Sequence, residues 1–169
     1  MADAKTHANK QLILAIGALA CAVLLFAGGF FILNHTKEDA AAYTPDQIVQ
    51  KILDETKHTD LVKVDQSQVL KHYDIPDGVV SASSVYTGKS SESAAELSCF
   101  LMTSSSRYDE LQKVISRHIS TKAAGFKTLN PAQYKLLKDC KIVHEGRYVL
   151  VSVGNDNTQA ENIFRSMVG

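Results

Sequence analysis

The chain has 169 residues, 45% of them apolar, and its 18 basic and 18 acidic side chains cancel to a net charge of zero. This length suits one domain of ordinary size and is too short for two large ones. Without a net positive charge there is no field to attract nucleic acid, so we expect no nucleic-acid partner. The apolar residues are concentrated near the N-terminus, which argues against a disordered chain and a purely cytosolic enzyme.

Residues 12–33 are the most apolar part of the chain, with 22 consecutive residues that carry no charge. As a helix they would extend about 33 Å, which matches a hydrocarbon core of roughly 30 Å. We therefore predict an uncleaved signal-anchor, a transmembrane helix whose partner is the lipid bilayer. Three alternatives fit less well, and the weakest of them is a buried helix of a globular domain. A signal peptide cleaved near Ala40–Ala42 would have a shorter apolar run, and a lipid-modified Cys21 would be followed by polar sequence.

The charges that flank this run predict its orientation. Lys5 and Lys10 precede it, whereas a single lysine follows closely, beside two acidic residues. The positive-inside rule then places residues 1–11 in the cytoplasm and exports the C-terminal part of a single-pass protein of the cell membrane. We expect residues 34–43 to form a short tether and residues 44–169 to form one extracytoplasmic domain.

The exported part begins with two predicted helices and a hairpin. Thr44–Gln47 and Asp65–Gln68 each offer an N-cap, and apolar residues follow both at helical spacing. Residues 79–87 are rich in β-branched and small side chains, and residues 96–103 alternate between polar and apolar positions. Because turn residues at Gly88–Ser91 separate these two segments, we predict a β-hairpin.

The remaining residues repeat this order in a shorter form. A helix capped at Ser106–Asp109 follows the hairpin, and another helix starts at Asn130. Residues 141–144 and 148–153 form the second predicted hairpin, and Thr158 caps the last helix. Two hairpins that are each followed by a helix predict an α+β fold with one four-stranded antiparallel sheet and helices packed on one face.

The order of these features resembles a bacterial family catalogued as domain of unknown function 4358, from Asp46 to the C-terminus. The residues that carry the resemblance are Tyr73–Ile75, Ala95–Leu97, Arg117, Pro131–Tyr134, Leu137 and Gly146–Val149. Members of that family look like single extracytoplasmic domains behind a membrane span or a lipid anchor. The resemblance therefore implies a location in the bacterial cell envelope and an α+β fold, and it implies no activity.

Glu96 is the most interesting carboxylate, because it lies in a strand between apolar neighbours and belongs to the resemblance. Alternation along residues 96–103 places it opposite Leu97 and Leu101, on the face of the sheet that we expect to be exposed. One interpretation is a binding surface, and the other is a solvated residue or a structural ion pair. The candidate partners of Glu96 on this surface are Arg117, Tyr134 and Tyr148.

We expect no metal ion, no cofactor and no catalytic constellation. The exported histidines have no partner histidine four residues along the chain, and His118 lies on an apolar helix stripe, as packing residues do. Gly88–Ser90 lacks the first glycine of a phosphate-binding loop. Cys99 and Cys140 would form a disulfide in an oxidising compartment or pack separately, and separate packing is the better interpretation.

Three functions fit this sequence. The leading hypothesis is a binding or accessory module of the cell envelope, whose partner is an envelope protein or a small ligand. The second is an enzyme that acts on envelope material with Glu96 as the acid–base residue, which predicts a deep pocket around Glu96 and a raised carboxyl pKa. The third is a structural subunit that assembles through its transmembrane helix.

Overall fold

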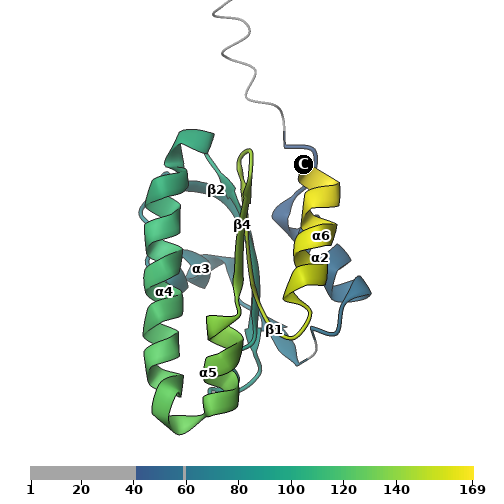
Figure 1. Ribbon diagram of the computed structural model, residues 1–169. Coiled ribbons are helices and arrows are strands. Elements are labelled where there is room, and N and C mark those ends of the chain that lie inside the picture. The colour runs from purple at the N-terminus through teal and green to yellow at the C-terminus, as the bar shows by residue number, and fades with distance from the viewer. Residues whose placement is uncertain (1–40, 59) are drawn as a thin grey trace, which may run out of the picture. The chain divides into compact units, whose positions relative to one another are not determined.

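The computed structural model describes residues 41–58 and 60–169 (Figure 1). The predicted cytoplasmic segment 1–11, the transmembrane helix 12–33 and most of the tether lie outside the described residues. Within the described residues, none of the helices combines the length and apolar character that a membrane crossing requires. In chain order the elements are α2 (Pro45–Glu55), β1 (Leu61–Lys63), α3 (Gln66–Tyr73), β2 (Val80–Gly88), β3 (Glu96–Met102), the 3-10 helix η1 (Ser105–Arg107), α4 (Tyr108–Leu129), α5 (Pro131–Lys138), β4 (Lys141–Glu145), β5 (Tyr148–Val153) and α6 (Asn157–Val168).

The five strands form one antiparallel sheet in the order β1-β2-β3-β5-β4. The four predicted strands are all present, and β2 pairs with β3 while β4 pairs with β5, as the two hairpins require. Strand β1 was not predicted, and it adds a fifth strand by pairing Leu61 with Gly88 at the end of β2. A strand of three residues is too short to show an alternating pattern, so it left no signal in the sequence.

Helices cover both faces of the sheet, and the prediction of helices on one face is wrong. Figure 1 shows α4 and α5 on one side of the strands and α2 and α6 on the other. All seven residues of β3 are buried, with Leu97 and Leu101 in the α2/α6 cluster and Phe100 and Met102 in the α3/α4/α5 cluster. A central strand that is buried on both faces carries large apolar side chains at successive positions, as Phe100–Met102 does.

Capping explains where several helices begin. The Thr44 side chain accepts a hydrogen bond from the Gln47 amide, and the Gln47 side chain accepts one from the Thr44 amide, which makes the predicted capping box. Asp65 and Asn130 also cap helices as predicted. The predicted caps at Ser106 and Thr158 are wrong. Among the described residues, no side chain caps α4, which continues from the turn of η1, or α6, which begins after Asp156.

Candidate functional site: a buried carboxylate beside a polar pocket

Three elements, α3, β3 and α4, bring polar side chains together on the α3/α4/α5 side of the sheet. Glu96 is the first residue of β3, and Tyr73 is the last residue of α3. His118 and Lys122 lie four residues apart on α4, so one turn of that helix places both on the same face. The site is therefore assembled from residues separated by 22 to 26 positions along the chain.

Glu96 is fully buried, and both of its carboxylate oxygens have hydrogen-bond partners. The Lys122 ammonium group donates to Oε2 at 2.8 Å, and His118 Nε2 lies 3.0 Å from the same oxygen. The Tyr73 hydroxyl donates to Oε1 and lies 3.1 Å from Ser98 Oγ. A buried carboxylate that has these partners is fixed in position, because any displacement would leave a charge without compensation.

The surrounding charges determine the protonation state of Glu96. Burial alone would raise its pKa, but the hydrogen bond with His118 and the charge of Lys122 outweigh burial and lower the pKa to about 2. Burial raises the pKa of the Tyr73 hydroxyl, and the neighbouring Glu96 charge raises it further. Tyr73 therefore stays neutral, as a donor to Oε1 must, and Glu96 carries its charge at every physiological pH.

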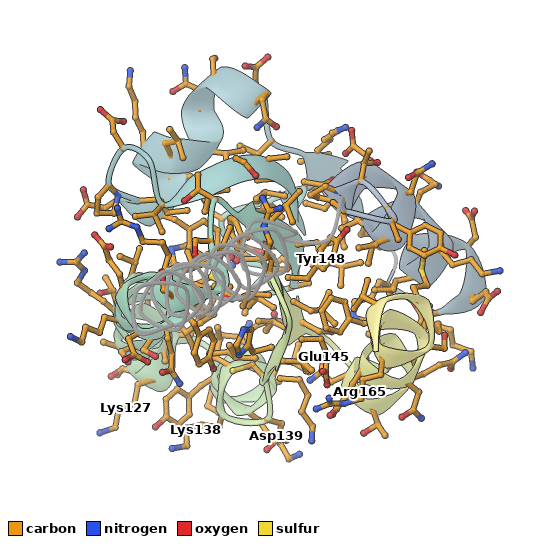
Figure 2. All side chains as sticks on the ribbon, turned by 90° about the horizontal axis from the view of Figure 1, so that it is seen from above. Lys127, Lys138, Asp139, Glu145, Tyr148 and Arg165 are labelled. Atoms are coloured by element: carbon orange, nitrogen blue, oxygen red, sulfur yellow. The ribbon has the colours of Figure 1, made fainter. Side chains whose placement is uncertain are left out.

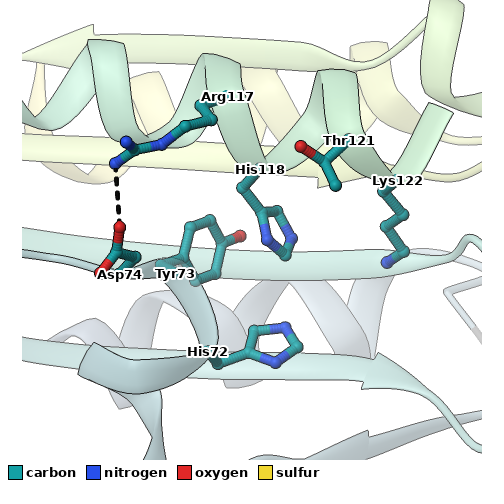
Figure 3. Close-up of a pocket in the computed structure, with 7 residues that line it drawn as sticks. All are labelled: His72, Tyr73, Asp74, Arg117, His118, Thr121 and Lys122. Carbon is teal, nitrogen blue, oxygen red and sulfur yellow. Dashed lines mark ion pairs between the residues drawn. The ribbon is translucent and has the colours of Figure 1, made fainter. Parts of the chain in front are cut away.

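A pocket of about 330 Å³ lies between α3 and α4 beside this cluster (Figure 3). Its lining residues are His72, Tyr73, Asp74, Arg117, His118, Thr121 and Lys122. Glu96 does not line the pocket, but it contacts three of the residues that do. Hydrogen bonds to the buried Glu96 carboxylate therefore fix the orientation of three side chains that line the pocket. Contacts of this kind hold binding groups in fixed positions.

Arg117 and Asp74 form the outer part of this pocket. The Arg117 guanidinium lies 3.2 Å from the Asp74 carboxylate, and both side chains are largely exposed. Asp74 ends α3 in the left-handed conformation, with φ of 59°. Because this ion pair is solvated, it opens at little cost in free energy and leaves the pocket accessible.

The histidine rings of the pocket are close to each other and to Glu96. The ring of His118 stacks on Tyr73 at a centroid distance of 4.1 Å, and the ring of His72 lies 5.1 Å from that of His118. Figure 3 shows His72 on α3 and His118 on α4 facing the same space. One ligand atom each from His72, Glu96 and His118 lies within 4.8 Å of the other two, which is a spacing from which a metal ion can be bound.

The predicted partners of Glu96 do not meet it. Arg117 lines the pocket but pairs with Asp74, and Tyr134 lines a second pocket between α4 and α5. Two lysines of that second pocket, Lys127 and Lys138, point outward in Figure 2. The sheet face that we expected to be exposed is covered at Glu96 by Tyr73 of α3 and by His118 and Lys122 of α4.

Tyr148 lies on the opposite face of the sheet, in the α2/α6 cluster. Its hydroxyl donates to the Tyr43 carbonyl at 2.7 Å and accepts from the Tyr43 amide at 3.2 Å. Nearby, Arg165 of α6 forms an ion pair with Glu145 of β4 (Figure 2). Tyr148 therefore holds the end of the predicted tether against the domain and takes no part in the pocket.

Cys99 and Cys140 are free thiols within the described part of the chain. Cys99 is buried in the α2/α6 cluster, whereas Cys140 packs against the cluster on the other face of the sheet. Burial raises the pKa of both thiols, so each is neutral and unreactive at pH 7. Separate packing, which we favoured from the sequence, is what the structure shows.

A second polar cluster lies under the start of α6. His58 Nε2 lies 3.1 Å from Ser152 Oγ, and Ser152 donates to the Asn157 side chain at 2.9 Å. Burial lowers the pKa of His58, so its ring is neutral at pH 7. Ser152 is fully buried, so no substrate reaches its hydroxyl, and this cluster joins the segment after α2 to β5 and α6.

The assembly of Tyr73, His118 and Lys122 around Glu96 was not predicted. His118 was expected to be a packing residue, and its ring does stack on Tyr73, but its Nε2 atom also contacts the buried carboxylate. The available signal was the pair of polar residues four positions apart on the apolar stripe of α4, together with one glutamate in a buried strand. The sequence pattern does not indicate which strand faces which helix, so it does not join these two signals.

The fold and the cluster define a small α+β domain in which an antiparallel sheet between two helix layers carries a buried glutamate beside a polar pocket. The family model described as Domain of unknown function (DUF4358) matches residues 54–154, more than half of the chain, and the chain belongs to this family. The match confirms the resemblance seen in the sequence and includes all the residues of the cluster and the pocket. Neither the curated proteins nor the solved structures contain a significant match.

Proposed function

We propose that this chain is a membrane-anchored binding module of the cell envelope, and that the pocket between α3 and α4 is its ligand site. Residues 12–33 would be the single-pass anchor, with residues 1–11 in the cytoplasm and the domain from residue 44 onward outside it. The apolar length of the run and the lysines before it support this arrangement.

The observation that carries the proposed binding role is the buried charge behind the pocket. Burying an ionised carboxylate is costly, and replacing such a cluster by apolar residues is often neutral or stabilising. In the fold, Glu96 has polar partners on both carboxylate oxygens, and two of them, His118 and Lys122, also line the pocket. A pocket of about 330 Å³ is at the small end of ligand sites, so it suits an ion or a small molecule better than a protein segment.

The enzyme alternative has less support. It required a raised pKa at Glu96, and the pKa is lowered to about 2, so the carboxyl group holds no proton to donate at neutral pH. Both oxygens are already engaged, and the carboxylate does not line the pocket. The structural-subunit alternative depends on residues 12–33, which lie outside the described residues, and it remains a separate hypothesis.

The location is tested by labelling single cysteines in intact cells. Thr121 lines the pocket and is exposed, so the Thr121→Cys variant should react with a membrane-impermeant maleimide before the cells are opened. The Lys5→Cys variant should react only after permeabilisation, and the unsubstituted chain gives the background. Labelling of both variants only after permeabilisation would overturn the extracytoplasmic location.

The binding role is tested by filling the pocket. A ligand present at about 100 times its Kd stabilises a protein by about 2.7 kcal/mol, which raises the apparent Tm by several degrees. We expect the full chain to have a higher Tm in freshly isolated membranes than in exhaustively washed ones. Thr121→Trp should abolish this difference by filling the pocket, whereas Ser116→Trp, on an exposed position of α4 outside the pocket, should preserve it. Equal differences in both variants would show that the pocket holds no ligand.

A further inference from the structure

We infer that His72, Glu96 and His118 form a site for a divalent transition-metal ion, for which zinc has the best-matched chemistry. This inference rests on the proposed binding role of the pocket and names its ligand. Two imidazoles and one carboxylate are the protein ligands of many zinc sites that keep an open coordination position. The three ligand atoms come from α3, β3 and α4 and lie within 4.8 Å of one another.

The spacing of the two inner ligands already fits a metal ion. His118 Nε2 and Glu96 Oε2 are 3.0 Å apart, and two ligands of a tetrahedral ion with bonds of 2.0–2.1 Å are about 3.3 Å apart. A change of a few tenths of an ångström therefore converts this hydrogen-bonded pair into a pair of ligands. The proton between the two atoms must leave Nε2, either to Nδ1 of the same ring or to solvent, before the nitrogen can bind the ion.

His72 supplies the movable third ligand. It lies in the last turn of α3, its side chain is exposed, and its ring faces the ring of His118 across the pocket (Figure 3). Its ligand atom already lies within 4.8 Å of the other two, and an exposed side chain has room to rotate toward them. The fourth coordination position then faces the pocket, where water or a small anionic ligand can bind.

The groups behind Glu96 hold it as a metal site requires. The Tyr73 hydroxyl donates to Oε1, and Oε2 is directed toward His118. Ligand carboxylates in metal sites are commonly held by a hydrogen bond of this kind, because it fixes their orientation. The Tyr73 ring, which stacks on His118, fixes the second ligand at the same time.

Lys122 is the competitor for this site. Its ammonium group donates to the same Oε2 atom at 2.8 Å, so a metal ion and the ammonium group cannot both occupy that side of the carboxylate. Lys122 also lines the pocket, and its ammonium group is carried by a flexible side chain. The ammonium group can therefore move outward when an ion enters. This competition gives a test that separates a cation site from an anion site, since removal of Lys122 favours a cation and disfavours an anion.

The experiment is a titration of the full chain, purified in detergent, with zinc chloride by calorimetry and with cobalt chloride by visible absorption. The full chain should bind one equivalent of zinc, and cobalt should give the absorption bands of a four-coordinate ion. His118→Ala and His72→Ala should each lower zinc affinity by more than about 100-fold, beyond the effect of a group that only orients a ligand. His72 is exposed, so its variant keeps the fold even if the His118 variant does not.

Two further variants serve as controls. His144→Ala removes a histidine that stacks on Tyr108 and does not line the pocket, so zinc affinity should be unchanged. Lys122→Met should tighten zinc binding by about tenfold, because it removes a like charge next to the ion. Equal affinities in the His72→Ala and His144→Ala variants would overturn the metal site. Weaker zinc binding in Lys122→Met would also overturn it.

The outcome separates this inference from the proposed function. If Thr121→Trp abolishes the stabilisation in membranes while zinc fails to bind the full chain, the pocket binds a ligand of another class. If neither effect is seen, the proposed binding role fails together with the metal site. Zinc binding that depends on His72 and His118 supports both.

Discussion

The folded state favours the ionised form of Glu96 over the protonated form, and this preference can be measured directly. Its pKa is about 2 in the folded chain against an ordinary value of 4.5, and a difference of one pKa unit corresponds to 1.36 kcal/mol. The folded state therefore favours the charged form by about 3 kcal/mol. Glu96→Gln keeps the shape of the side chain but removes the charge that Lys122 and His118 compensate, so we expect it to destabilise the fold by about 3 kcal/mol at pH 7.

The assay is urea unfolding of the full chain and of two variants between pH 7 and pH 2. Glu92→Gln is the matched control, since Glu92 is exposed in the turn before β3 and its substitution should change the free energy of unfolding by less than about 0.5 kcal/mol. The lowered pKa of Glu96 sets the sign of the pH dependence. The contribution of the Glu96 charge to the free energy of unfolding is complete above pH 4.5, where Glu96 is ionised in the unfolded chain as well. This contribution is lost as pH falls toward 2.

The difference in stability between the full chain and Glu96→Gln should therefore shrink as pH falls through this window. If Glu96→Gln were as stable as Glu92→Gln at pH 7, the buried charge would contribute nothing. A difference that grew at low pH would mean that the folded state favours the protonated carboxyl, contrary to the cluster described above.

Other predictions concern the rest of the domain. Burial lowers the pKa of His58, so stability should fall as pH drops below 6.5, where the unfolded ring gains a proton. In urea unfolding, the free energy of unfolding of a His58→Gln variant should depend less on pH between 7.5 and 5. Tyr148→Phe removes the hydrogen bond to the Tyr43 carbonyl and should cost about 1 kcal/mol while speeding hydrogen exchange at the Tyr43 amide; unchanged exchange would contradict this contact. Gly154→Ala would place a Cβ atom 2.7 Å from His58 Nε2 and should lower stability by about 1–3 kcal/mol. Gly125→Ala, in open space on α4, should raise stability by about 0.5–1 kcal/mol, and thermal unfolding of both variants tests these two predictions.

The elements of this fold were predictable where local chemistry determines them. The capping box at Thr44 and the caps at Asp65 and Asn130 bond to residues two or three positions away, so the sequence contains the whole interaction. The two hairpins were also predictable, because turn residues separate segments of strand-like composition. Strand β1 was missed since its three residues are held by pairing with β2 and show no pattern of their own.

The candidate site was only half predictable, for a related reason. Glu96 stood out as a carboxylate in an apolar strand, and His118 was visible on the stripe of α4. Their contact depends on α4 covering the face of β3 that the alternating pattern assigned to solvent. That assignment assumed one buried face, whereas the full burial of β3 follows from its central place in a sheet between two helix layers.

The zinc X-ray absorption spectrum of the full chain loaded with one equivalent of zinc tests the proposed ligand site most directly. We predict nitrogen and oxygen ligands at 2.0–2.1 Å, with the scattering features of two imidazole rings in the full chain and of one ring in the His72→Ala variant. A first shell made only of oxygen, or a spectrum that His72→Ala leaves unchanged, would contradict a metal ion held by His72, Glu96 and His118.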